Sequence, residues 1–480
     1  MTESMPRKPS RPRRPRPPGR RRGPERPPAD DPARLAALDT LRAVRERDAY
    51  ANLVLPGLLR QRRITGRDAA LATELAYGAC RAQGLLDQIL AVCVDRPLSA
   101  LDGPALDVLR LGCYQLLRTR IPPHAAVAAT VDLARSTAGS PVAGLVNAVL
   151  RKVSEQDERA WVDQLAPDRE TDPIGYLAVA TAHPRWIAEA FGKALGDNEN
   201  ELAAALTADD ERPAVHLAAR PGEVSAEELA AMTGGEEAPY SPYGVRLDAG
   251  AGDPADLDPV REKLAAVQDE GSQLCALALT RAELTGPDER WLDLCAGPGG
   301  KAALLGALVR MNGGTVDAVE HAPHRADLVR KATSGLPVTV HVVDGRDPGL
   351  PPGEYDRVLV DAPCTGLGAL RRRPEARWRR RPEDVPELVA LQRELLMSAL
   401  RLVRPGGVVA YVVCTPHLPE TTELVDGVLA DSGAQRLDAR ECFPGVSDLG
   451  DGPYVQLWPY RQGTDAMFCA LLRRPVRPAT

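Results

Sequence analysis

Two cysteines in the last third of the chain are placed where they could support thiol chemistry. Cys364 ends the segment DAPC at residues 361–364, and Cys414 ends the segment YVVC at residues 411–414. Each segment follows an apolar, strand-like run, and the carboxyl ends of neighbouring parallel strands meet at one edge of a sheet. A single cysteine is more often a small buried hydrophobe. Two of them at neighbouring strand ends suggest thiol chemistry instead.

A pair of thiols beside a methyl donor suits methylation at carbon 5 of cytosine. Carbon 5 is a poor nucleophile until a thiolate adds to carbon 6, after which it can attack a sulfonium methyl group. Loss of the carbon-5 proton and of the thiolate then restores the aromatic ring. Such a site requires a cysteine of low pKa and a carboxylic group near the N3 and N4 edge of the base. Asp361 can provide that carboxylic group.

The segment DLCAGPGGK at residues 293–301 lies between a strand-like run and a helical run, and it predicts a cofactor loop. Glycines let the backbone approach a ligand and present N–H groups at a helix start. The loop also fits a G-x-G-x-x-A dinucleotide pattern, which is a weak signal. A Walker A loop is excluded, because Cys295 and Ala302 stand where it needs Gly and Ser or Thr. Acids end the next two strands, and we expect Glu320 to hold the ribose hydroxyls and Asp344 to lie near an adenine edge.

The elements that must position these loops lie in residues 263–477, where strand-like apolar runs alternate with amphipathic helical runs. This alternation predicts an α/β domain with a parallel, doubly wound sheet and helices on both faces. The strand candidates are RWLDLC, TVDAVE, VTVHVV, DRVLVDA and GVVAYVVC. The loops described above follow directly after these runs, where ligands bind in such sheets.

Three further regions are expected before this domain. Residues 1–33 form a basic tail; residues 1–30 alone hold ten Arg or Lys, three acids and nine prolines. This composition predicts disorder, and either a solubilising extension or a phosphate-binding arm. Residues 34–165 repeat apolar positions at three- and four-residue spacing and predict an all-α bundle, interrupted by the prolines at 122–123. Residues 166–262 mix one helical run with short β-like pieces and predict a small α+β connector.

The composition excludes several classes of protein. Hydrophobic residues make up 44% and charged residues 26%, which is ordinary for a globular chain, and no apolar run approaches the ~18 residues that cross a bilayer. The N-terminus lacks the apolar run of a secretory signal. Nine cysteines without CxxC pairs or metal-like spacing favour reduced thiols in the cytoplasm and no metal site. The net charge of −6 divides into roughly +7 in the tail and −13 elsewhere, so any RNA surface on the folded part must be local.

Two sets of segments resemble known families. ELAYGACR, LGCYQLLRTRIPPHAAV and GLVNAVLRKV resemble the NusB-like RNA-binding domain over the whole helical bundle. VQDEGSQ, DLCAGPGGK, VVDGRDP, DAPCTGLGALRRRPEARW and YVVCTPHLPE resemble the Sun/Fmu branch of the RNA cytosine-5 methyltransferases. The two resemblances together span most of residues 34–472. They imply a bacterial small-subunit (16S) rRNA methyltransferase with S-adenosylmethionine as cofactor and ribosomal RNA as partner.

The resemblance also implies a role for each matched position. Cys414 would be the nucleophile, and Cys364 would help to expel it after transfer. Cys364 is also a rival for the nucleophile, because DNA cytosine-5 methyltransferases attack with the Cys of a Pro-Cys pair. The S-adenosylmethionine site would be lined by Cys295, Ala296, Gly297, Pro298, Gly299, Gly300, Lys301, Glu320, Asp344 and Asp361.

Several positions differ from the family pattern. Val413 stands where a Thr usually precedes the nucleophile, and Thr415 replaces a Ser. Glu420-Thr421-Thr422 replaces a Glu-Glu-Asn, and Ala466-Met467 replaces a Gly-Phe pair. These differences bear on the fit to RNA and on local support of the nucleophile, and they leave the core chemistry intact.

Seven arginines cluster around Trp378 directly after the Cys364 loop. Guanidinium groups clamp phosphates and stack on unpaired bases, whereas a run of charges more commonly forms a solvated face. Because all seven share one sign beside the predicted site, we expect them to bind RNA together with Trp378. The arginines are Arg371, Arg372, Arg373, Arg377, Arg379, Arg380 and Arg381.

These patterns together predict an S-adenosylmethionine-dependent rRNA (cytosine-5-)-methyltransferase, expected to be a monomer without a membrane partner. The same chemistry on tRNA or another RNA is one alternative. A non-catalytic NusB-like RNA-binding factor is a second, although both cysteines and all three acids are present. A dinucleotide-dependent oxidoreductase is a third, in which the two cysteine loops would have no role.

Overall fold

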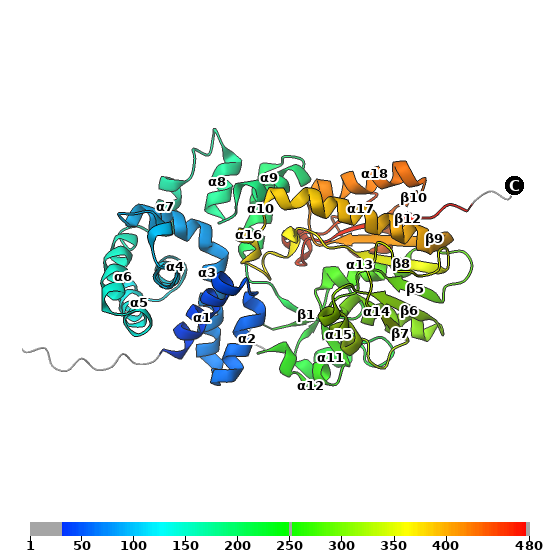
Figure 1. The fold of residues 1–480 in the computed structure, drawn as a ribbon, viewed down its shortest axis with the longest axis horizontal. Helices are drawn as coiled ribbons and strands as arrows, with labels where there is room; N and C mark the ends of the chain where they lie inside the picture. Colours follow the sequence, from blue (N-terminus) through cyan, green and yellow to red (C-terminus); the bar gives the residue numbers. More distant parts are fainter. Residues whose placement is uncertain (1–30, 249–251, 477–480) are drawn as a thin grey trace, which may run out of the picture.

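The computed structural model describes residues 31–248 and 252–476, with an all-helical region at one end and a large sheet at the other (Figure 1). The predicted tail at residues 1–33 lies outside the described residues except for its end, where Pro32 already begins the first helix. No helix within the two described ranges is both long and apolar enough to cross a membrane. In the same part of the chain, no three His, Cys, Asp or Glu are grouped so that they could hold a metal ion.

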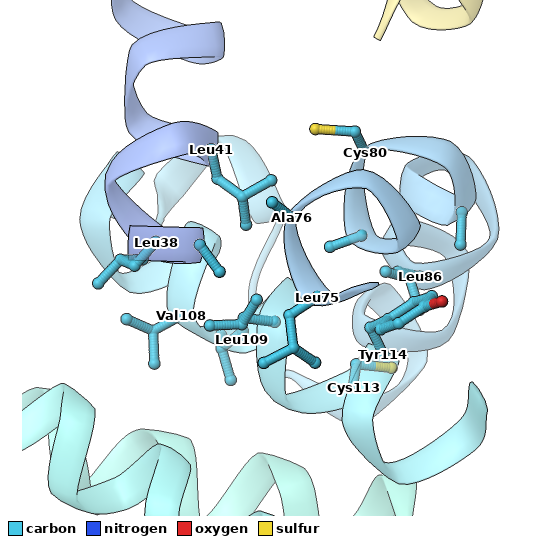
Figure 2. Close-up of a cluster of buried hydrophobic side chains, with 14 of the residues drawn as sticks. Leu38, Leu41, Leu75, Ala76, Cys80, Leu86, Val108, Leu109, Cys113 and Tyr114 are labelled. Atoms are coloured by element: carbon cyan, nitrogen blue, oxygen red, sulfur yellow. The ribbon is translucent and has the colours of Figure 1, made fainter. Parts of the chain in front are cut away.

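Seven helices form the predicted N-terminal bundle. They are α1 (Pro32–Arg47), α2 (Ala51–Arg62), α3 (Gly66–Cys93), α4 (Gly103–Arg118), α5 (Pro123–Ala138), α6 (Ser140–Val153) and α7 (Glu158–Leu165). Figure 2 shows part of their core, in which Leu75 of α3 and Leu109 of α4 are fully buried. A Cβ on Gly78 would lie 2.0 Å from the ring of Tyr114. The close crossing of α3 and α4 therefore requires a glycine in the segment ELAYGACR.

In its described residues, the connector contains five α-helices and a small antiparallel sheet of order β2-β3-β1-β4. Its elements are α8 (Pro173–Ala180), α9 (Arg185–Ala194), α10 (Glu199–Asp210), β1 (Val215–Ala219), α11 (Ala226–Thr233), β2 (Glu236–Glu237), β3 (Gly244–Leu247), α12 (Asp258–Arg261) and β4 (Ala265–Val267). The sheet extends beyond the expected boundary at residue 262, because Val267 of β4 pairs with Leu217 of β1. Helices α8 to α10 pack against Leu367 and Leu370 of the C-terminal domain.

A mixed sheet of order β10-β12-β9-β8-β5-β6-β7 forms the centre of the C-terminal domain. All five predicted strands are present and parallel: β5 (Arg290–Asp293), β6 (Thr315–Val319), β7 (Val338–His341), β8 (Tyr355–Asp361) and β9 (Val403–Val413). The expectation of a wholly parallel sheet is wrong at one edge, where β12 (Phe468–Arg473) runs antiparallel to β9 and to β10 (Gln435–Leu437). A parallel strand needs a long crossover, usually a helix. The chain instead enters β12 from β11 (Val455–Gln456) through the single turn α19 (Pro459–Gln462).

Helices cover both faces of this sheet (Figure 1). The helices are α13 (Glu270–Arg281), α14 (Gly300–Met311), α15 (Pro323–Ala332), α17 (Val385–Leu402) and α18 (Thr422–Ser432). Val358 and Val360 of β8 are buried in the cluster with α17 and α18, and Leu359 between them is buried in the cluster with α13 and α14. Because both faces are covered, β8 is apolar throughout its centre instead of alternating.

Candidate active site

The glycine-rich loop between β5 and α14 is shaped by two close contacts. A Cβ on Gly297 would lie 2.1 Å from Oε2 of Glu320, and one on Gly299 would lie 2.8 Å from the Cβ of Ala332. Gly299 also has φ +114°, a conformation that favours glycine. Glycines therefore allow the loop to lie directly against the acid that follows β6.

The two predicted acids follow β6 and β7 at the same edge of the sheet. Glu320 is buried, and its Oε1 accepts a hydrogen bond of 2.9 Å from the N–H of Ala322. Its other oxygen lies 3.4 Å from Nε of Arg325. Asp344 is exposed, and hydrogen bonds from Arg346 lower the pKa of its carboxyl group. Glu320 thus faces the loop directly, whereas Asp344 is held by its neighbouring arginine.

Negative charge accumulates beside the loop. Asp293 is fully buried, and its Oδ2 has no hydrogen-bond partner among the described residues. Burial, reinforced by the charge of Asp361, raises the pKa of Asp293 to about 7. Nζ of Lys301 donates to Oδ2 of Asp361 over 2.8 Å. Asp293, Asp361 and Glu320 outnumber the two neighbouring cations, which are Lys301 and Arg325. The site therefore suits a cofactor with cationic groups, such as the sulfonium and ammonium of S-adenosylmethionine.

The two cysteines come together at the ends of β8 and β9, with their Sγ atoms 3.4 Å apart. The hydrogen bond from Cys364 lowers the pKa of Cys414, and the positive charges of Arg373 and Lys301 lower it further. The same hydrogen bond, together with burial, raises the pKa of Cys364. Cys414 is therefore the more acidic of the two thiols, and Cys364 can act as the hydrogen-bond donor when Cys414 is ionised.

Glu420 joins the two cysteine loops, and sequence reasoning did not assign it a role. Its buried carboxylate accepts hydrogen bonds from the N–H of Thr365 over 2.8 Å and from Nε2 of Gln392 over 3.0 Å. The hydroxyls of Thr365 and Thr415, which directly follow the two cysteines, lie 3.1 Å apart and both reach Glu420. The threonine that follows each cysteine in the sequence was the one feature that could have indicated this network. The network sets the relative position of the two loops.

Part of the predicted arginine surface is buried and holds the C-terminal domain together. Arg371 is only 7% exposed, and its Nε donates to Oδ1 of Asp465 over 3.1 Å. Arg372 donates to the same carboxylate and to Oδ1 of Asp269 over 2.6 Å. Because the charges of Arg371 and Arg372 are paired with carboxylates inside the protein, the prediction that these two residues bind RNA is corrected. Both are structural.

Arg377 and Trp378 hold the C-terminal domain against the other two regions. The Arg377 guanidinium is fully buried and lies 3.4 Å from the carboxylate of Asp209 in α10. The ring N–H of Trp378 donates to the carbonyl of Cys80 in α3 over 2.8 Å, and a Cβ on Gly84 would lie 2.2 Å from the Trp378 ring. A fully buried guanidinium cannot reach a phosphate, so the RNA-binding prediction for Arg377 is corrected too. Trp378 is half-buried, and its binding of RNA stays a prediction.

The rest of the cluster is divided. Arg379 and Arg380 are half-buried, whereas Arg373 and Arg381 are exposed. Arg379 donates to the carbonyls of the loop before α2. RNA binding by Arg373 stays a prediction.

The chain is similar to known proteins over most of its length. The family model described as "16S rRNA methyltransferase RsmB/F" matches residues 283–473, and the NusB family model matches residues 31–155. The chain is 60% identical to "Putative methyltransferase Rv1407" of Mycobacterium tuberculosis, covering 95% of this chain and 99% of that protein. It is 34% identical to "Ribosomal RNA small subunit methyltransferase B" of Pseudomonas putida, covering 84% and 91%. The crystal structure of PH0851 shares the fold, with a TM-score of 0.76 at 23% identity and coverage of 93% and 99%.

The fold and the site define an S-adenosylmethionine-dependent RNA methyltransferase, in agreement with these matches. The chain belongs to the RsmB/F methyltransferase family and carries a NusB-family domain at residues 31–155. Both resemblances seen in the sequence are confirmed.

Proposed function

We propose that this enzyme methylates carbon 5 of a cytosine in small-subunit (16S) rRNA through a covalent bond between Cys414 and carbon 6 of the base. The observation that carries the proposal is the 3.4 Å contact between the sulfurs of Cys364 and Cys414 at neighbouring strand ends. Two thiols in one hydrogen bond provide one group for addition and a second for release. The name of the P. putida relative supports small-subunit rRNA as the substrate.

S-adenosylmethionine supplies the electrophilic methyl group that carbon 5 takes up. The loop at residues 295–301 would hold it, with Glu320 accepting hydrogen bonds from the ribose hydroxyls and Asp344 near the adenine edge. The unpartnered Oδ2 of Asp293 provides a buried acceptor for a cationic group of the cofactor.

The chain's own residues would act on the base in sequence. The Cys414 thiolate adds to carbon 6 and makes carbon 5 nucleophilic, while Asp361, fixed by Lys301 at 2.8 Å, accepts a hydrogen bond from the amino group of the base. After transfer, a solvent water takes the carbon-5 proton. The electron pair of that C–H bond re-forms the double bond between carbons 5 and 6, and the bond from sulfur to carbon 6 breaks with Cys414 leaving as the thiolate. Cys364 donates its hydrogen bond to the departing thiolate, as it does to the free thiolate at the start.

The direct test is the identity of the methylated nucleoside. We expect purified enzyme, S-adenosylmethionine and 16S rRNA to yield 5-methylcytidine after digestion, and the Cys414→Ala variant to yield none. Naked rRNA and small-subunit particles are compared as substrates, and bisulfite sequencing of rRNA from cells with and without the gene locates the base. A different methylated nucleoside would contradict the chemistry, and modification of tRNA alone would contradict the substrate. We infer that the enzyme acts as a monomer in the cytoplasm, because the proposed substrate is ribosomal RNA.

A further inference from the structure

Arg373 differs from the other arginines that were expected to bind RNA. Its neighbours Arg371, Arg372 and Arg377 are paired with carboxylates inside the protein. Arg373 is exposed, and within residues 31–248 and 252–476 its guanidinium forms no ion pair and no hydrogen bond. It lies instead over an aromatic ring, with its central carbon 5.4 Å from the centroid of Tyr50.

Tyr50 belongs to the N-terminal bundle, directly before α2, and its side chain is 41% exposed. The ring also contacts the Arg379 guanidinium, whose central carbon lies 5.7 Å from the centroid. Arg379 is anchored by hydrogen bonds to the carbonyls of Val44, Asp48 and Ala49. The bundle therefore presents Tyr50 in a defined position, and Arg373 of the C-terminal domain rests on it.

Arg373 follows the Cys364 loop in the chain, nine positions after Cys364. After the hydrogen bond from Cys364, its positive charge is among the influences that lower the pKa of Cys414. A planar guanidinium that stacks by its face on a ring keeps its N–H edge free for hydrogen bonds. This edge matches the geometry of a phosphate, which it can bind through two parallel hydrogen bonds.

We propose that Tyr50 and Arg373 form a phosphate clamp, shared between the bundle and the C-terminal domain, that holds the RNA backbone next to the target cytosine. The inference rests on the proposed function, because it takes RNA as the substrate of the Cys414 site. Arg373 binds the phosphate, and Tyr50 is a positioning residue that holds the guanidinium through the cation–π contact. The bundle thus contributes a side chain to substrate binding at the methylation site itself.

The test compares the full-length variants Arg373→Gln, Tyr50→Leu and Tyr50→Phe, with Arg436→Gln as the matched control, because Arg436 is an exposed arginine of β10 that lies over the ring of Tyr454. In Arg373→Gln, one phosphate contact is lost. The slope of the logarithm of RNA affinity against the logarithm of salt concentration should therefore become less negative by about 0.7. A cation–π contact of about 0.5–1 kcal/mol corresponds to a two- to fivefold rise in KM for RNA in Tyr50→Leu. Tyr50→Phe keeps the ring and should stay within about twofold of the wild type, since its stacking face is unchanged. Affinity for S-adenosylmethionine should not change in any variant.

Unchanged KM and salt slope in both Arg373→Gln and Tyr50→Leu, with 5-methylcytidine still formed, would overturn the clamp and leave the proposed function standing. A lower melting temperature in Tyr50→Leu with an unchanged salt slope would make Tyr50 a structural brace and also overturn it. If Tyr50→Leu does not fold, Arg373→Gln decides the outcome. If no 5-methylcytidine forms at all, the proposed function fails, and equilibrium RNA binding by the same variants still tests the clamp.

Discussion

The sulfurs of Cys364 and Cys414 lie 3.4 Å apart, although 50 positions separate the two residues in the chain. The hydrogen bond between them favours the thiolate on Cys414 and the neutral thiol on Cys364. The two groups therefore begin the reaction in different protonation states, and removing one should not have the same effect as removing the other.

Replacing each cysteine in turn distinguishes attack from release. We expect Cys414→Ala to abolish methylation and to form no covalent adduct with RNA, because the attacking sulfur is gone. Cys364→Ala should form the adduct but release it slowly, leaving an enzyme–RNA species on a denaturing gel. A trapped species that forms only in Cys414→Ala would make Cys364 the nucleophile.

The same hydrogen bond predicts a pH effect. A donor to a thiolate lowers the pKa of that thiol, so Cys364→Ala should raise the pKa of Cys414 and move its reactivity to higher pH. Cys364→Ser keeps a donor and should stay closer to the wild type. The rate at which iodoacetamide labels the Cys414 peptide, followed by mass spectrometry across pH, measures the shift. An identical profile in Cys364→Ala would show that the contact does not act on Cys414.

Glu320 should act on the cofactor and not on RNA. Hydrogen bonds to a charged acceptor contribute about 1.5–3 kcal/mol each, so Glu320→Ala should weaken S-adenosylmethionine binding about tenfold to a hundredfold. Calorimetry measures the affinity, and Asp327→Ala on the exposed side of α15 serves as the control. Unchanged cofactor affinity would remove Glu320 from the site.

The buried arginine between the domains should matter for stability. Removing one partner of a buried ion pair costs about 3–5 kcal/mol, so Arg377→Ala should lower the urea midpoint markedly. The exposed Arg381→Ala variant should change stability by no more than about 0.5 kcal/mol. An Arg377→Ala variant of normal stability but weaker RNA affinity would return Arg377 to the RNA surface.

Local patterns predicted most of the fold and the cofactor loop. Gly297 and Gly299 follow a strand and precede a helix, so the short motif at residues 293–301 is enough to predict a glycine-rich loop there. The partners of the arginines were not visible in this way, because Arg377 and Asp209 are 168 positions apart. The role of Glu420 was missed for a related reason: its hydrogen bonds to Thr365 and Gln392 cross between elements. Whether a charged residue is buried depends on such distant partners. The run of arginines alone could therefore not show whether these residues form an exposed RNA-binding surface or a buried interface between domains.

The contacts of Trp378 with α3 and of Arg377 with α10 also bear on how a target is selected. The first contact joins the C-terminal domain to the bundle, and the second joins it to the connector. Under the proposed function, an RNA that engages both the bundle and the Cys414 site must therefore present its contact point and its reactive base at a set distance from each other. The target cytosine would then be selected by its position in the folded RNA as well as by the neighbouring nucleotides.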